Sequence, residues 1–156
     1  MTIHAATPAR PATRGRLTGT IAAACFWAYL VALTVATHVP RIDPAYFATV
    51  GRWSPLHPDK TMHLIAYGIL GGLAGAAFAR GLTAAAIIRL FVALACWGFI
   101  DEFTQPFFGR VAELLDWGHD IVGLVIGLSC AVALHRWRDS AGQAQGAGPE
   151  SGRRSS

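Results

Sequence analysis

The chain has 156 residues, of which 53% are hydrophobic and 14% are charged, with a mean hydropathy of +0.41. About a quarter of the residues in a soluble domain are charged, so this composition argues against a soluble protein and favours a lipid-exposed surface. The net charge of +4 comes mostly from arginines outside the apolar stretches, which marks membrane topology and argues against nucleic-acid binding.

Four apolar stretches approach the roughly 20 residues that a helix needs to cross the hydrocarbon core of a bilayer. We expect membrane-spanning helices at 17–37, 61–78, 83–103 and 115–134. The first stretch is too long for the apolar region of a secretory signal peptide, so we expect it to be retained as a helix. The predicted fold class is therefore all-α, an integral membrane four-helix bundle.

The basic residues predict the orientation of this bundle. Nine of the 13 Lys and Arg residues fall on the side of the two termini and four on the other side, which places both termini in the cytoplasm. We expect three regions: a disordered basic N-terminal tail at 1–16, the transmembrane domain at 17–138 and a disordered C-terminal tail at 139–156. In the first external loop, Asp43 and Pro44 favour a short interfacial helix.

Small residues recur at four-residue spacing, which lets helices pack closely in lipid. The positions concerned are Gly68 and Gly72, Gly71 and Gly75, Gly123 and Gly127, and the stripe Ala24, Ala28, Ala32 and Ala36. We interpret all of them as packing features without chemistry of their own.

Polar residues gather at the outer ends of the second, third and fourth predicted helices. Only 11 apolar residues separate Arg89 from Asp101, too few to cross the core, so the acidic residues are drawn below the surface and must face the bundle interior. We expect one outward-facing pocket with the binding residues Asp59, Lys60, His63, Tyr67, Glu102, Gln105, Arg110, Asp116 and Asp120. His38, His57 and His135 lie near the interfaces and are expected to take no part.

The pocket is acidic, which bears on the chemistry of its ligand. Apart from the first loop, six carboxylates face only Lys60 and Arg110. This excess favours a cationic or amide-bearing ligand, whereas a phosphate would need Arg110, Lys60 or a bridging metal. The sequence has no compact metal-ligand motif, so neither a metal nor another cofactor is expected.

Two segments carry a family resemblance. HPDKTMHLIAYGILG and DEFTQPFFGRVAELLDWGHDIVGLVIG resemble the D-K-x-x-H-x-x-x-Y segment and the E-x-x-Q…R…D-x-x-x-N-x-x-G-x-x-x-G segment of VanZ-like membrane proteins. The resemblance covers about 58–127 and implies roles for Asp59, Lys60, His63, Tyr67, Glu102, Gln105, Arg110, Asp116, Gly123 and Gly127. Asp120 stands where the family commonly has Asn. The family takes its name from a protein linked to low-level resistance to teicoplanin, a glycopeptide antibiotic.

Three functional hypotheses follow from these residues and from the resemblance. The first is a protein of the bacterial cytoplasmic membrane that binds membrane lipids or another amphiphile, such as a lipid-linked cell-envelope precursor or a glycopeptide, and contributes to antibiotic resistance. The second is a small membrane enzyme with Glu102 as general base, Asp120 or His119 as acid partner and Arg110 stabilising an anion. The third is a membrane scaffold in which the charges only hold the helices together.

Overall fold

The computed structural model describes residues 12–39, 58–110 and 112–146, with side chains described at 17–39, 60–110 and 112–143. The elements within these ranges are all helical. They are α1 Ala12–His38, α3 Pro58–Phe78, α4 Ala84–Thr104, the short 3-10 helix η2 Gln105–Phe108, and α5 Leu114–Gly146.

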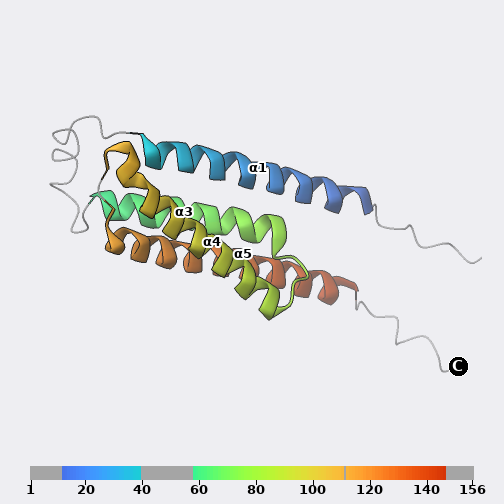
Figure 1. Ribbon diagram of the computed structural model, residues 1–156. Coiled ribbons are helices and arrows are strands. Elements are labelled where there is room, and N and C mark those ends of the chain that lie inside the picture. The colour runs from blue at the N-terminus through green and yellow to red at the C-terminus, as the bar shows by residue number, and fades with distance from the viewer. Residues whose placement is uncertain (1–11, 40–57, 111, 147–156) are drawn as a thin grey trace, which may run out of the picture.

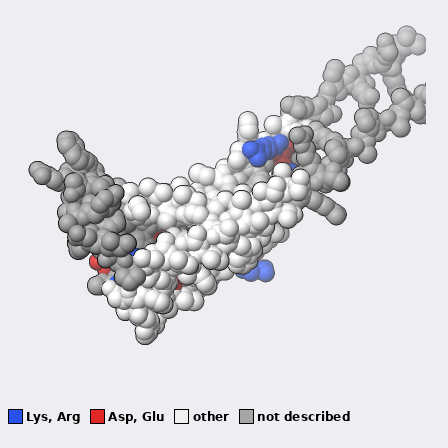
Figure 2. Space-filling view, turned by 90° about the horizontal axis from the view of Figure 1, so that it is seen from above, with Lys and Arg blue, Asp and Glu red and all other residues white. Residues whose placement is uncertain are grey.

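The described helices are long and apolar enough for four passages through a membrane. The candidate spans are Leu17–His38, Lys60–Phe78, Ala84–Phe108 and Leu114–Gln143. Between the two ends of the bundle, the face seen in Figure 2 is almost free of Lys, Arg, Asp and Glu side chains. The predicted all-helical fold is confirmed within the described ranges, and four of the helices are long and apolar enough to span a membrane.

Two helices extend into segments that we predicted to be unstructured tails. α1 already begins at Ala12 and α5 continues to Gly146, beyond the expected limits at 16 and 138. Once a membrane span has nucleated a helix, each further residue adds a hydrogen bond at little extra cost, and no proline follows until Pro149. The helix predicted in the first external loop lies outside the described residues.

The closest packing in the bundle is between α3 and α5, and it depends on glycine. A β-carbon at Gly123 or Gly127 would collide with the backbone of α3 at Leu64, Gly68 or Gly72. The two helices therefore approach backbone to backbone, as the glycine spacing predicts. This approach fixes the polar residues of α3 and α5 against one another.

The other two helices pack on this central pair. α1 lies mainly on α3, and α4 lies mainly on α5 (Figure 1). Buried side chains of α1 at Phe26, Leu30 and Leu33 join the apolar core with Leu70 and Leu94. The predicted alanine stripe of α1 is not part of this packing, because all four of its residues are exposed. The bulkier residues on the opposite face bury more apolar surface, so they decide which face packs inward.

The turns between the helices bring four helix ends to the same end of the bundle. Gly81, with φ 71°, lies in the short turn between α3 and α4, and Gly109, with φ 75°, ends η2. The start of α1 and the end of α5 lie at one end of the bundle (Figure 1). At the other end are the last turn of α1, the first turn of α3, η2 and the first turn of α5. We call this second end the polar end.

Candidate functional site

The polar end contains a buried imidazole between two carboxylates. Nδ1 of His63 lies 2.9 Å from Oδ1 of Asp120, and its Nε2 lies 3.8 Å from Oδ2 of Asp116. The two aspartates are one turn apart on α5, so they present their side chains to the same part of α3. The exposed fractions are only 6% for His63, 3% for Asp116 and 1% for Asp120. The imidazole between them reduces the cost of burying both carboxylates.

One turn further along α3 from the polar end, Tyr67 connects this cluster to α4. Its ring is fully buried and lies parallel to that of His63, with the centroids 6.5 Å apart. The Tyr67 hydroxyl donates to Oδ2 of Asp101 at 3.2 Å. The close approach of the ring depends on Gly98, where a β-carbon would lie 3.0 Å from Cε1 of Tyr67. The predicted polar face of α3 therefore points into the bundle.

Asp101 holds three helices together. Its Oδ1 accepts a hydrogen bond from the hydroxyl of Thr37 at 2.9 Å, while its Oδ2 accepts one from Tyr67. Thr37 belongs to α1 and Tyr67 to α3, so this buried carboxyl group of α4 has both oxygens engaged. Hydrogen bonds to a charged acceptor are among the stronger ones.

Glu102 has a different set of partners. Its Oε2 accepts from Nε2 of Gln105 at 2.8 Å, and its Oε1 accepts from the backbone N–H of Glu113 at 2.6 Å. Glu113 directly precedes α5, so Glu102 fixes the start of that helix relative to η2. Both carboxylate oxygens of Glu102, the predicted general base, thus accept hydrogen bonds from protein groups.

The two cations at the polar end differ in their surroundings. Nζ of Lys60 lies 3.6 Å from Oε2 of Glu113. Nη1 of Arg110 donates to the carbonyl oxygen of Thr37 at 2.7 Å, and its Nε is buried without a hydrogen-bond partner. None of the ion pairs within the described ranges involves Arg110. Its guanidinium therefore has donors left for a ligand.

The prediction that His38 takes no part was wrong. Its Nε2 lies 2.9 Å from the hydroxyl of Thr104, its Nδ1 lies 3.6 Å from Oδ1 of Asp101, and its ring packs edge to face on Phe108. We also assigned no role to Thr37. The missed signal is positional, because the end of the first span must lie at the same depth as the end of the third.

Other predicted residues lie apart from this network. Nδ1 of His119 lies 2.7 Å from the carbonyl oxygen of Leu115, in its own helix, so His119 does not join Asp120. His135 contacts the carbonyl of Gly75 near the opposite end of the bundle. Asp59 is in the first turn of α3, but its side chain lies outside the described ones, and His57 precedes the described part of that helix.

The described His, Cys, Asp and Glu side chains form no group of three or more that could hold a metal ion. His63 directs its two ring nitrogens to different aspartates, so these three groups do not converge on one point. The arrangement can orient hydrogen bonds and hold the helices in register. Of its two described cations, Lys60 lies beside Glu113, whereas Arg110 forms no ion pair within the described ranges.

Comparisons with known proteins give no match. No protein-family model, no curated protein and no solved structure matches the chain. The resemblance of the two quoted segments to VanZ-like proteins therefore stays a prediction from the sequence.

Proposed function

We propose that this chain is a multi-pass membrane protein of the VanZ-like type that binds the head group of an anionic amphiphile at Arg110. The observation that carries the proposal is the arginine side chain itself. It lies at the polar end, it keeps free donors, and it forms no ion pair within the described ranges. A guanidinium with several free N–H donors matches the oxygens of a phosphate or carboxylate.

The buried acids are compatible with this choice of ligand. The acidic excess by itself favours a cationic ligand. However, Asp101 and Glu102 each have both oxygens engaged by protein donors, and Asp120 is paired with His63. These groups act as internal supports, and none of them is presented to a ligand in the way that Arg110 is.

We place the polar end at the outer leaflet of the bacterial cytoplasmic membrane, with both termini in the cytoplasm. The support is the distribution of Lys and Arg, nine on the side of the termini and four on the other. An amphiphile of the outer leaflet, such as an anionic phospholipid, a lipid-linked envelope precursor or a lipidated glycopeptide, then meets Arg110 at the level of its head group.

The test compares two arginine variants by native mass spectrometry in detergent with added phosphatidylglycerol. Arg110→Ala removes the proposed head-group contact. Arg138→Ala removes an exposed arginine near the opposite end of α5 and is the matched control. We expect Arg110→Ala to lose the bound phosphatidylglycerol and Arg138→Ala to keep it. Equal retention by both variants would contradict the proposal.

The resistance part of the proposal needs a cellular test. A Gram-positive host expressing the wild-type chain is expected to tolerate more teicoplanin than one expressing Arg110→Ala at the same membrane level. If the wild type gives no protection, the resistance proposal fails, while lipid binding is still decided by the mass spectrometry.

A second candidate is a small membrane enzyme, which the His63–Asp120 pair favours. A histidine that is oriented by a carboxylate is a common general base. Catalysis by Glu102 or Asp120 would be indicated if Glu102→Gln or Asp120→Asn kept lipid binding but lost turnover of that lipid.

A further inference from the structure

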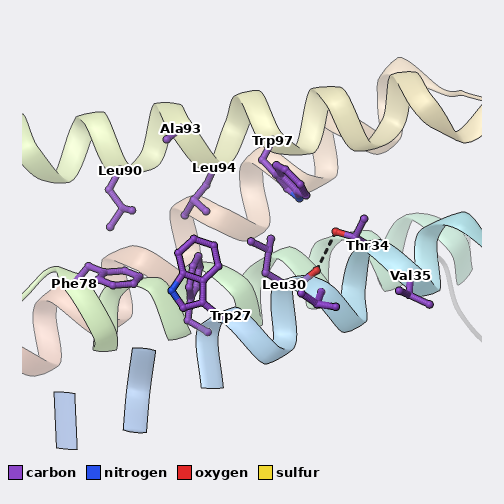
Figure 3. Close-up of a pocket in the computed structure, with 11 residues that line it drawn as sticks. Trp27, Leu30, Thr34, Val35, Phe78, Leu90, Ala93, Leu94 and Trp97 are labelled. Carbon is purple, nitrogen blue, oxygen red and sulfur yellow. Dashed lines mark hydrogen bonds between the residues drawn. The ribbon is translucent and has the colours of Figure 1, made fainter. Parts of the chain in front are cut away.

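A large apolar groove lies between α1 and α4 and extends from Phe78, the last residue of α3, towards the polar end. Its volume is about 730 Å³, within the range of roughly 300–1,000 Å³ that is usual for ligand pockets. Trp27 and Leu30 of α1 face Leu90 and Leu94 of α4 across the groove (Figure 3). Phe78 of α3 lies at the end of the groove that is further from the polar end. The groove exists because α1 packs on α3 and α4 on α5, which leaves these two helices apart in between.

The lining of the groove suits a hydrocarbon chain. None of the residues that line the groove is charged. Thr34 contributes a hydroxyl group, which donates to the carbonyl oxygen of Leu30 in its own helix at 2.9 Å. The groove is open towards lipid, since Trp27 and Val31 of its wall are 58% and 62% exposed. At this depth of a bilayer the space would be filled by hydrocarbon and not by water.

The length of the groove is comparable to the thickness of one leaflet. From Trp27 to Val35 the groove follows α1 for about 12 Å, and half of the hydrocarbon core is roughly 15 Å thick. These residues belong to the half of α1 next to the polar end. On the other helices the lining extends further from the polar end, to Leu90 of α4 and to Phe78, the last residue of α3. An acyl chain whose head group lies at the polar end can therefore run along the groove towards Phe78.

The groove leads towards the proposed head-group site. Trp97, at the end of its α4 wall, is one turn from Asp101, so the two residues share a face of the helix. Asp101 accepts from the hydroxyl of Thr37, and the carbonyl oxygen of Thr37 accepts from Arg110. The apolar groove thus ends one helical turn from Asp101, which is connected through Thr37 to a cation that has no ion pair within the described ranges.

We infer that the α1–α4 groove holds one acyl chain of an anionic phospholipid whose phosphate is bound by Arg110. This inference rests on the proposed function for the head group, and it adds the chain-binding site and the class of lipid. A lipid held at both ends is expected to stay with the protein, whereas lipids on the other helix faces exchange freely.

The experiment uses photo-crosslinking of the full chain in liposomes of phosphatidylcholine with a small share of phosphatidylglycerol. The phosphatidylglycerol carries a diazirine in one acyl chain, and the labelled residues are mapped by mass spectrometry. Ala93→Phe fills the groove from α4 and Val31→Trp fills it from α1. Ala28→Phe adds the same ring to an exposed position of α1 that does not line the groove. Thermal unfolding verifies that the variants are folded.

We expect the label to concentrate on the groove walls in the wild type and in Ala28→Phe. In Ala93→Phe and Val31→Trp this preference should be lost, and labelling of α1 and α4 should fall to the level on the lipid-facing side of α5. Even labelling of all lipid-facing surfaces in the wild type would overturn the inference, as would groove labelling that neither filling variant reduces.

The Arg110→Ala variant separates this inference from the proposed function. If groove labelling is sensitive to the filling variants but equal for wild type and Arg110→Ala, the chain site stands and the head-group proposal fails. If labelling shows no groove preference but Arg110→Ala still loses phosphatidylglycerol in native mass spectrometry, the head-group proposal stands and the groove inference fails.

Discussion

The hydroxyl of Thr37 donates to Oδ1 of Asp101 at 2.9 Å, across 64 positions of the sequence. This hydrogen bond joins the end of α1 to α4, two helices that otherwise pack mainly on other partners. It also lies between the apolar groove and Arg110, because the carbonyl oxygen of Thr37 accepts from the guanidinium. Through these two hydrogen bonds of Thr37, the end of α1 is part of the polar network.

Removing this hydroxyl should destabilise the bundle. We expect Thr37→Val to reduce the free energy of unfolding by about 1.5–3 kcal/mol, because a buried acidic acceptor loses its donor. Thr34→Val is the control, since its hydroxyl bonds only within α1. Thermal unfolding in detergent compares the two, and a loss for Thr34→Val as large as that for Thr37→Val would contradict this role.

The close α3–α5 contact predicts a sharp difference between glycines of the same helix. Gly127→Ala should destabilise the protein by about 1–3 kcal/mol or more, because its new methyl group meets the α3 backbone, which cannot move aside easily. Gly118→Ala meets nothing within 4 Å and should be neutral or slightly stabilising. The measurement is the midpoint of thermal unfolding, and equal midpoints would refute the packing argument.

The His63–Asp120 pair predicts that shape and hydrogen bonding matter more than charge at Asp120. Asp120→Asn keeps an acceptor oxygen for Nδ1 of His63 and should retain most of the stability. Asp120→Leu leaves a buried imidazole without this partner, which should cost about 1–3 kcal/mol. Unfolding by heat in detergent tests both variants, and equal losses would show that the negative charge itself is required.

The proposed orientation can be tested with fluorescent fusions. A fluorescent protein that matures only in the cytoplasm should fluoresce when it follows Ser156. It should stay dark when the chain is truncated after Arg110, because three spans then place the fusion on the other side. The reverse pattern would move the polar end to the inner leaflet and would remove the proposed access to outer-leaflet amphiphiles.

The sequence by itself determined the four helices and the gathering of polar residues at one end of the bundle. Membrane spans follow from the length of apolar runs, and residues such as His63 and Tyr67 follow from four-residue spacing on one helix face. The glycines at 123 and 127 predicted close packing because a missing side chain is itself visible in the sequence. The extension of α5 to Gly146 was missed, because we expected the helix to end with its apolar run. No residue before Gly146 stops a helix that has already formed.

Only the tertiary structure decided which polar residues meet. The partners Thr37 and Asp101, or His63 and Asp120, come from different helices, and their contact depends on how each helix is rotated about its axis. The groove also arises only in three dimensions, from the unequal spacing of α1 and α4 on the central pair. Local spacing describes one helix at a time, whereas a site between helices depends on their relative rotation and distance.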